Sequence, residues 1–127
     1  MDVRAREPVI FAGDFSPLVA WYVRALGFAV TRLEEERYHY ANLESPAGVK
    51  LGIADAREMG VEPGDRSRNT VVLQFEVPDV RAFLSLVGES GGRVTFGPSQ
   101  DADDGFWFGG FADPEGNPFW VVDETCP

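Results

Sequence analysis

One pattern of turns, helix ends and strand-like segments occurs twice along this 127-residue chain, and this internal repeat constrains the fold more than any other feature. The copies are offset by 65 residues at the start of the pattern and by 68 residues towards its end. The three additional residues fit into the acidic loop at 101–104. Such a repeat indicates two copies of one supersecondary unit. The corresponding positions are Asp14 and Asp79, the segments 26–28 and 91–93, and the Pro-x-Gly turns at 46–48 and 114–116.

Hydrophobic spacing predicts the elements of the first copy. A short apolar run precedes a helix for which Ser16 is the N-cap, Pro17 the first residue and Gly27 the residue beyond the end. Apolar side chains recur on one face of this helix, and segments typical of strands follow it. We expect strands at residues 8–12, 28–33, 37–43 and 49–54.

The second copy follows a polar segment at 55–69, which predicts a connecting loop with a helical turn at its start. Its helix is capped by Asp79 and ends near the Gly91–Gly92 pair. We expect strands at residues 70–77, 93–96, 105–112 and 118–122.

Together these elements predict an α+β fold of two tandem βαβββ units, at about residues 7–55 and 69–124, within one domain that spans residues 1–127. In each unit the helix would cover one face of a curved mixed sheet. The other, concave faces would stay open, and two such faces can enclose a cavity. A hydrophobic content of 44%, with 10 Phe, 3 Tyr and 3 Trp, is sufficient for a packed core.

The charge balance limits the partners of the chain. Its 21 acidic and 11 basic residues give a formal charge of -10. Proteins that bind nucleic acid or an anionic membrane present basic surfaces, so we expect neither partner. The negative field would attract a cationic ligand instead, although solubility alone is an alternative reason for the acidity.

The chain has a single histidine, His39, and a single cysteine, Cys126. These numbers exclude a disulfide within the chain, a zinc site with several thiolates and a metal site with several imidazoles. The N-terminal residues lack the apolar segment of a signal peptide, and no apolar run is long enough to cross a membrane. We therefore expect a cytoplasmic protein.

Several motifs resemble the vicinal oxygen chelate superfamily, which includes glyoxalase I, extradiol dioxygenases, and fosfomycin and bleomycin resistance proteins. They are WYVRALGF after Asp14, and FADPEGN at 111–117 followed by alternating apolar residues. The bleomycin resistance branch is the most similar, through PVIFAGD at 8–14, VKLGIADAREM at 49–59 and FADPEGNPFWVVDE at 111–124. That branch carries tryptophans on its fifth strand, whereas this chain reads TVVLQFEV there, so the resemblance favours a different ligand.

The resemblance also implies where enzymes of the superfamily would hold a divalent metal. The four corresponding positions are Glu7, Gly52, Val72 and Trp120. A divalent ion needs three or four convergent nitrogen, oxygen or sulfur donors, and only Glu7 supplies one. We therefore expect no metal, no cofactor and no catalytic residue at these positions.

Strand alternation indicates what would line the cavity instead, because side chains two residues apart point to the same face. Apolar residues of the opposite faces are expected to form the core against the helices: Ile10, Leu51, Ile53, Phe111, Phe119 and Val121. The alternation leaves the faces of His39 and Trp107 open. The predicted ligand-binding residues are six aromatic ones, Phe11, Tyr38, Tyr40, Phe106, Phe108 and Trp120, and four polar ones, Glu7, Lys50, Gln74 and Glu76.

Three functions follow as hypotheses. The first is a non-enzymatic protein that sequesters a planar or cationic small molecule, such as an antibiotic, in the aromatic cavity. The second is a glyoxalase- or dioxygenase-type enzyme, either metal-dependent through atypical ligands such as Glu7, His39 and Glu76, or metal-free with a glutamate base. The third is an interaction module whose cavity is filled by its own side chains. For each of them the resemblance implies a twofold homodimer.

Overall fold

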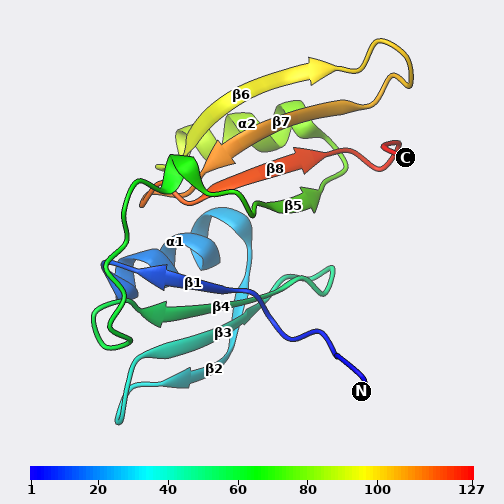
Figure 1. Ribbon diagram of the computed structural model, residues 1–127. Coiled ribbons are helices and arrows are strands. Elements are labelled where there is room, and N and C mark those ends of the chain that lie inside the picture. Colours follow the sequence, from blue (N-terminus) through cyan, green and yellow to red (C-terminus); the bar gives the residue numbers. More distant parts are fainter. The chain divides into compact units, whose positions relative to one another are not determined.

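The computed structural model describes all 127 residues and confirms the predicted tandem α+β arrangement. The chain forms two compact units, Met1–Gly64 and Asp65–Pro127, and each contains one βαβββ motif (Figure 1). The first unit consists of β1 (Val9–Ala12), α1 (Phe15–Leu26), β2 (Ala29–Glu34), β3 (Tyr40–Glu44) and β4 (Lys50–Asp55). The second consists of the 3-10 helix η1 (Arg66–Arg68), β5 (Leu73–Glu76), α2 (Val80–Glu89), β6 (Arg93–Gln100), β7 (Trp107–Ala112) and β8 (Pro118–Val122).

Each unit has a four-stranded mixed sheet that is not closed into a barrel. Sheet A has the order β1-β4-β3-β2, and sheet B has the order β5-β8-β7-β6. The first strand of each unit runs parallel to the last one, and the remaining pairs are antiparallel. The chain must therefore cross over between the first and last strands, and the helix forms part of this connection.

One amphipathic helix covers one face of each sheet. In the first unit, Leu18, Trp21 and Tyr22 of α1 are buried. Alternate residues of the strands, such as Leu43 and Ile53, are buried with them. No helix combines the length and apolar character needed to cross a lipid bilayer.

Stacked phenylalanines form the core of the second unit. The rings of Phe111 and Phe119 lie 4.9 Å apart and are nearly parallel. Phe83 of α2 meets Phe111 edge-on at 5.2 Å. All six predicted core residues are buried, which confirms the predicted helix-facing sides: Ile10, Leu51, Ile53, Phe111, Phe119 and Val121.

Several boundaries differ from the prediction. Helix α1 begins at Phe15, with Asp14 rather than Ser16 at the N-cap, and the buried Phe15 ring anchors this first turn in the core. Strand β3 begins at Tyr40, so Tyr38 precedes it. Strand β6 continues to Gln100 instead of ending at 96, because irregular pairing beyond Phe96 lets the ladder with β7 resume.

The repeated Pro-x-Gly turns have the same backbone geometry. Gly48 and Gly116 both have a φ of 90°, a conformation that favours glycine. Each glycine donates its N–H at 2.9 Å to a carbonyl three residues earlier, on Ser45 or Asp113. The side chains of those two residues also accept backbone hydrogen bonds within their turns. The turns that join β3 to β4 and β7 to β8 are therefore equivalent.

Asp113 is the only buried charged residue and is 2% exposed. Its carboxylate accepts hydrogen bonds from the backbone N–H groups of Glu115 and Asn117, each at 3.0 Å, and from Asn117 Nδ2 at 2.7 Å. Arg66 Nη1 in turn donates hydrogen bonds to the Glu115 carbonyl oxygen at 3.0 Å and to the Glu115 carboxylate at 2.8 Å. This network fixes the turn before β8 and so the position of Trp120.

The Asp113→Ala substitution should lower the free energy of unfolding by about 3 kcal/mol, because it leaves buried donors without an acceptor. Denaturant titration of the purified protein measures this change. The matched control is Asp103→Ala, which removes an exposed carboxylate from the loop before β7 and should change stability little. Equal effects of the two substitutions would contradict the role of Asp113.

Candidate functional site

The open face of sheet A is polar. Cross-strand register brings Arg32 of β2, Asn42 of β3 and Gly52 of β4 into one row. One neighbouring row contains Tyr40, and the other contains Glu44 and its cross-strand neighbour Lys50. These residues alternate with the buried ones, so their side chains lie on the face that α1 does not cover.

Glu7 lies at the centre of a hydrogen-bonded cluster on this face. Its Oε1 accepts a hydrogen bond from the Tyr40 hydroxyl at 2.8 Å and another from Asn42 Nδ2 at 3.1 Å. Its Oε2 lies 3.5 Å from Arg6 Nε. The carboxylate predicted to lie at the cavity edge is therefore engaged by three neighbours.

Gly52 makes room for this cluster. A Cβ at this position would lie 2.7 Å from Tyr40 Cζ and 3.1 Å from Glu7 Cγ, and still closer to the tyrosine hydroxyl. The tyrosine can therefore lie across β4 only because residue 52 has no side chain. Gly52 corresponds to one of the four metal-ligand positions of the superfamily enzymes, and here the Tyr40 hydroxyl takes up its side-chain space.

The cluster shifts the pKa values of both acidic groups. Burial, followed by the hydrogen bond to Glu7, raises the pKa of Tyr40 from 10.0 to about 12. Hydrogen bonds, first from its own backbone N–H and then from Tyr40, lower the pKa of Glu7 below 4.5. The stabilisation by the Glu7 carboxylate is therefore present above the unfolded-state pKa and is lost as the pH falls through the folded-state value. At neutral pH the pair is a carboxylate and a neutral phenol.

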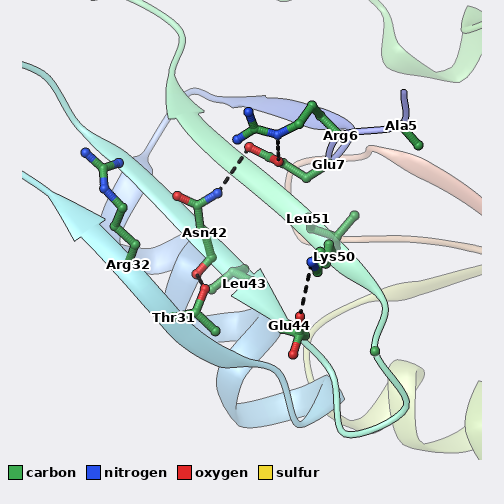
Figure 2. A pocket seen from close by; sticks show the side chains of 11 residues that line it. Ala5, Arg6, Glu7, Thr31, Arg32, Asn42, Leu43, Glu44, Lys50 and Leu51 are labelled. Carbon is green, nitrogen blue, oxygen red and sulfur yellow. Dashed lines mark hydrogen bonds and ion pairs between the residues drawn. The ribbon is translucent and has the colours of Figure 1, made fainter. Parts of the chain in front are cut away.

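A pocket of about 590 Å³ extends over this polar face (Figure 2). Three basic side chains surround it together with two glutamates, and Figure 2 shows Asn42 between Arg32 and Glu7. We call it the sheet A pocket. Its lining residues are Ala5, Arg6, Glu7, Thr31, Arg32, Asn42, Leu43, Glu44, Gly48, Lys50 and Leu51.

The open face of sheet B is aromatic. Trp120 is 54% exposed, and its ring meets that of Phe96 edge-on at 6.0 Å. The Phe96 ring occupies the space above Gly110, where a Cβ would lie 2.5 Å from its Cδ1. The pocket here, the sheet B pocket, has a volume of about 300 Å³ and is lined by Gln74, Phe96, Asp101, Phe106, Phe108, Gly109, Trp120, Val121, Val122 and Cys126.

The predicted site residues divide between the two units. Gln74, Phe106, Phe108 and Trp120 line the sheet B pocket, whereas Glu7 and Lys50 line the sheet A pocket. Tyr40 is hydrogen-bonded to Glu7, a lining residue of the sheet A pocket.

Besides Tyr40, three predicted residues lie outside both linings. Phe11 is 36% exposed on the open face of β1. Glu76 is paired in register with Val122, a lining residue of the sheet B pocket. Tyr38 precedes β3, and the Arg37 guanidinium lies 5.5 Å from the centre of its ring.

Phe96 and Asn42 are among the lining residues that the strand pattern did not predict. Asn42 has the same strand parity as Tyr40, so alternation alone could have found it. No sequence signal identified Phe96, because the predicted strand ended at this residue.

His39 and Trp107 lie on the helix-facing sides of their sheets. The His39 ring meets Phe15 of α1 edge-on at 5.3 Å, and its Nδ1 lies 2.6 Å from Glu58 Oε1. This hydrogen bond raises the pKa of His39 above 6.5. The Arg81 guanidinium of α2 lies 4.3 Å from the centre of a ring of Trp107.

The residues at the four metal-ligand positions do not fit a divalent ion. Glu7 is engaged by its hydrogen bonds, Gly52 has no side chain, and neither Val72 nor Trp120 offers a lone pair for coordination. No group of three or more His, Cys, Asp and Glu side chains is placed to hold a metal. His39, proposed as an atypical ligand beside Glu7, lies on the other face of sheet A.

Comparison with known families identifies the fold. Residues 8–122 match the model of the glyoxalase-like domain. The chain belongs to this glyoxalase-like family. Its two βαβββ units have the vicinal oxygen chelate fold that the sequence motifs resembled.

Solved structures of this superfamily show the same fold at low sequence identity. A glyoxalase family protein from Bacillus cereus has a TM-score of 0.79 at 10% identity, over 97% of this chain and 95% of that one. A glyoxalase/bleomycin resistance protein/dioxygenase superfamily member from Sphaerobacter thermophilus has a TM-score of 0.75 at 21% identity, over 96% and 98%. A family enzyme from Burkholderia phytofirmans has a TM-score of 0.71 at 17% identity, over 91% and 94%. A comparison with curated proteins gives no match.

The pKa of Tyr40 should fall from about 12 towards 10.0 in a Glu7→Gln variant, because the negative charge that opposes ionisation of the phenol is removed. Absorbance of the ionised phenol, followed as a function of pH, measures this pKa. The titration of a Tyr40→Phe variant gives the contribution of Tyr22 and Tyr38, which is subtracted. Glu44→Gln, on the same face, is the control and should leave the value unchanged. If the Glu7→Gln variant keeps a pKa of about 12, burial alone sets it.

Proposed function

We propose that this glyoxalase-like protein binds a planar, cationic small molecule, such as an antibiotic, on the open face of sheet B, and sequesters it in the manner of bleomycin resistance proteins. The observation that supports this proposal is the sheet B pocket, which combines aromatic rings with a carboxylate. No covalent step is part of the proposal. The ligand would be released unchanged.

The aromatic rings suit a flat ligand. Phe96 and Trp120 meet edge-on, and Phe106 and Phe108 lie 5.9 Å apart in a tilted arrangement. Trp120 is half exposed, so its indole can offer area to a ligand without first leaving the core. Offset stacking on such rings stabilises planar aromatic groups, and the ring faces also attract cations.

The charges around the pocket suit a cation. Asp101 lines the pocket. Glu76 lies on the open face of β5, in register with Val122. The second unit has eleven acidic and four basic residues, so most of the net charge of -10 belongs to it. Such a field raises the local concentration of a cationic ligand and speeds its capture.

The polar groups of the first unit are poorly suited to base catalysis. The lowered pKa of Glu7 makes it a weak base at neutral pH, and its oxygens already accept hydrogen bonds. His39 interacts with Glu58 on the helix-facing side of sheet A, away from Glu7. These placements favour binding over an enzyme that combines Glu7 with His39.

A Trp120→Ala variant should bind proflavine, a planar cation, about tenfold more weakly than the unaltered protein, since loss of one aromatic stacking partner costs about 1.5 kcal/mol. Calorimetric titration measures the affinity, and acridone serves as the neutral planar comparison. Leu86→Ala is the matched control, because Leu86 is an exposed apolar residue of α2. It should bind proflavine as the unaltered protein does.

Three results would contradict the proposal. One is equal binding of proflavine by the Trp120→Ala and unaltered proteins. Another is equal affinity for acridone and proflavine, which would show that the carboxylates do not contribute to binding. Chemical conversion of a bound antibiotic, detected by mass spectrometry, would replace sequestration by catalysis.

We also propose that the protein works in the cytoplasm as a homodimer. Both sheets are open, so each leaves two edge strands with unpaired backbone groups, and association with a second copy is one way to cover such edges. Light scattering should then give twice the chain mass of 14.0 kDa. A single-chain mass at working concentration would refute the dimer.

A further inference from the structure

We propose that the sheet A pocket is a second binding site, specific for the carboxylate group of a small organic acid, and that Arg32 is the residue that binds this group. The site lies within the first unit and is independent of the cation site proposed for sheet B. Its ligand has the opposite charge.

The sheet A pocket is a positive site in a negative protein. Three of the eleven basic residues of the chain, Arg6, Arg32 and Lys50, line it, against the two carboxylates of Glu7 and Glu44. The lining therefore carries one excess positive charge, whereas the whole chain carries -10. A general attraction to anions cannot arise from such a chain, so any anion bound here is held by local groups.

Both carboxylates of the pocket already have partners. Glu7 accepts hydrogen bonds from Tyr40 and Asn42 and lies 3.5 Å from Arg6 Nε. Glu44 Oε1 lies 3.8 Å from Lys50 Nζ. These contacts account for two of the three cations and leave the third available.

Arg32 is the remaining basic residue of the lining, and it forms no salt bridge. The nearest acidic influence is Glu34, which is hydrogen-bonded to Arg37 and which the Arg32 charge affects only weakly. Arg32 lies in β2 opposite Asn42, just after an irregularity in the pairing between Val30 and Arg32. Figure 2 shows its side chain rising on the same side of the sheet as Asn42 and Arg6. No carboxylate lies within 4.0 Å of its guanidinium. A guanidinium presents two parallel N–H donors that match the two oxygens of a carboxylate.

The charge count favours a carboxylate over a phosphate. One excess positive charge matches a singly charged group, whereas a phosphate dianion would place additional negative charge near Glu7 and Glu44. The pocket volume of about 590 Å³ leaves room for an organic body beyond the charged group. The Asn42 side chain, in register with Arg32, adds polar groups beside the ligand.

The test compares cyclohexanecarboxylate with its neutral isostere, cyclohexanecarboxamide, neither of which has an aromatic ring for the sheet B pocket. We expect the carboxylate to shift the backbone amide NMR signals of β2 and β3, and the carboxamide to leave them unchanged. Arg32→Gln should weaken carboxylate binding about tenfold, and Arg32→Lys, which keeps the charge but loses the paired donors, should weaken it less. Arg24→Gln makes the same charge change on α1 and should have no effect.

Several outcomes would overturn the proposal. They are equal binding of the acid and the amide, unchanged binding in the Arg32→Gln protein, and equal losses in the Arg24→Gln and Arg32→Gln proteins. Inorganic phosphate that binds more tightly than the carboxylate would refute the assigned ligand class. Protection of Lys50, the only lysine, from an amine reagent by the carboxylate is a second readout that does not depend on the variants. Failure of proflavine to bind bears only on the sheet B pocket.

Discussion

One helix can cover only one face of a four-stranded sheet, and the rest of this structure depends on that constraint. In each unit the covered face holds the core, from Trp21 and Ile53 in the first unit to Phe111 and Phe119 in the second. The opposite face has no helix, so its side chains remain accessible to small molecules. The candidate sites therefore lie on these open faces, and the turn and helix residues act by holding the sheets in register.

The two units use the same plan to make different surfaces. In sheet A, the absence of a side chain at Gly52 lets Tyr40 lie across the sheet and reach Glu7, which produces a polar face. In sheet B, the gap is at Gly110, and Phe96 fills it next to Trp120. A glycine on one strand thus decides which large side chain from a neighbouring strand occupies the face. The resulting Tyr–Glu cluster also takes up space that a metal ligand would need.

Much of the fold could be predicted because its signals are local. Strand alternation identified the buried residues correctly, and the repeat identified two equivalent units. Alternation also found Phe106, Phe108 and Trp120, which do line one pocket. It failed for Tyr38, because β3 begins at Tyr40, three residues later than the pattern indicated. It missed Phe96, because the irregular pairing of β6 with β7 has no counterpart in the sequence pattern.

By itself the sequence determined the repeat, the two helices, the buried faces and the lack of metal donors, since each depends on residue type and on spacing within one short segment. Only the tertiary structure decided which side chains meet on the open faces. The contact of Tyr40 with Glu7 joins residues 33 positions apart, and the lack of a salt bridge at Arg32 depends on how three strands are paired. Such contacts arise from strand register and from the space left by glycines, and no local pattern records either.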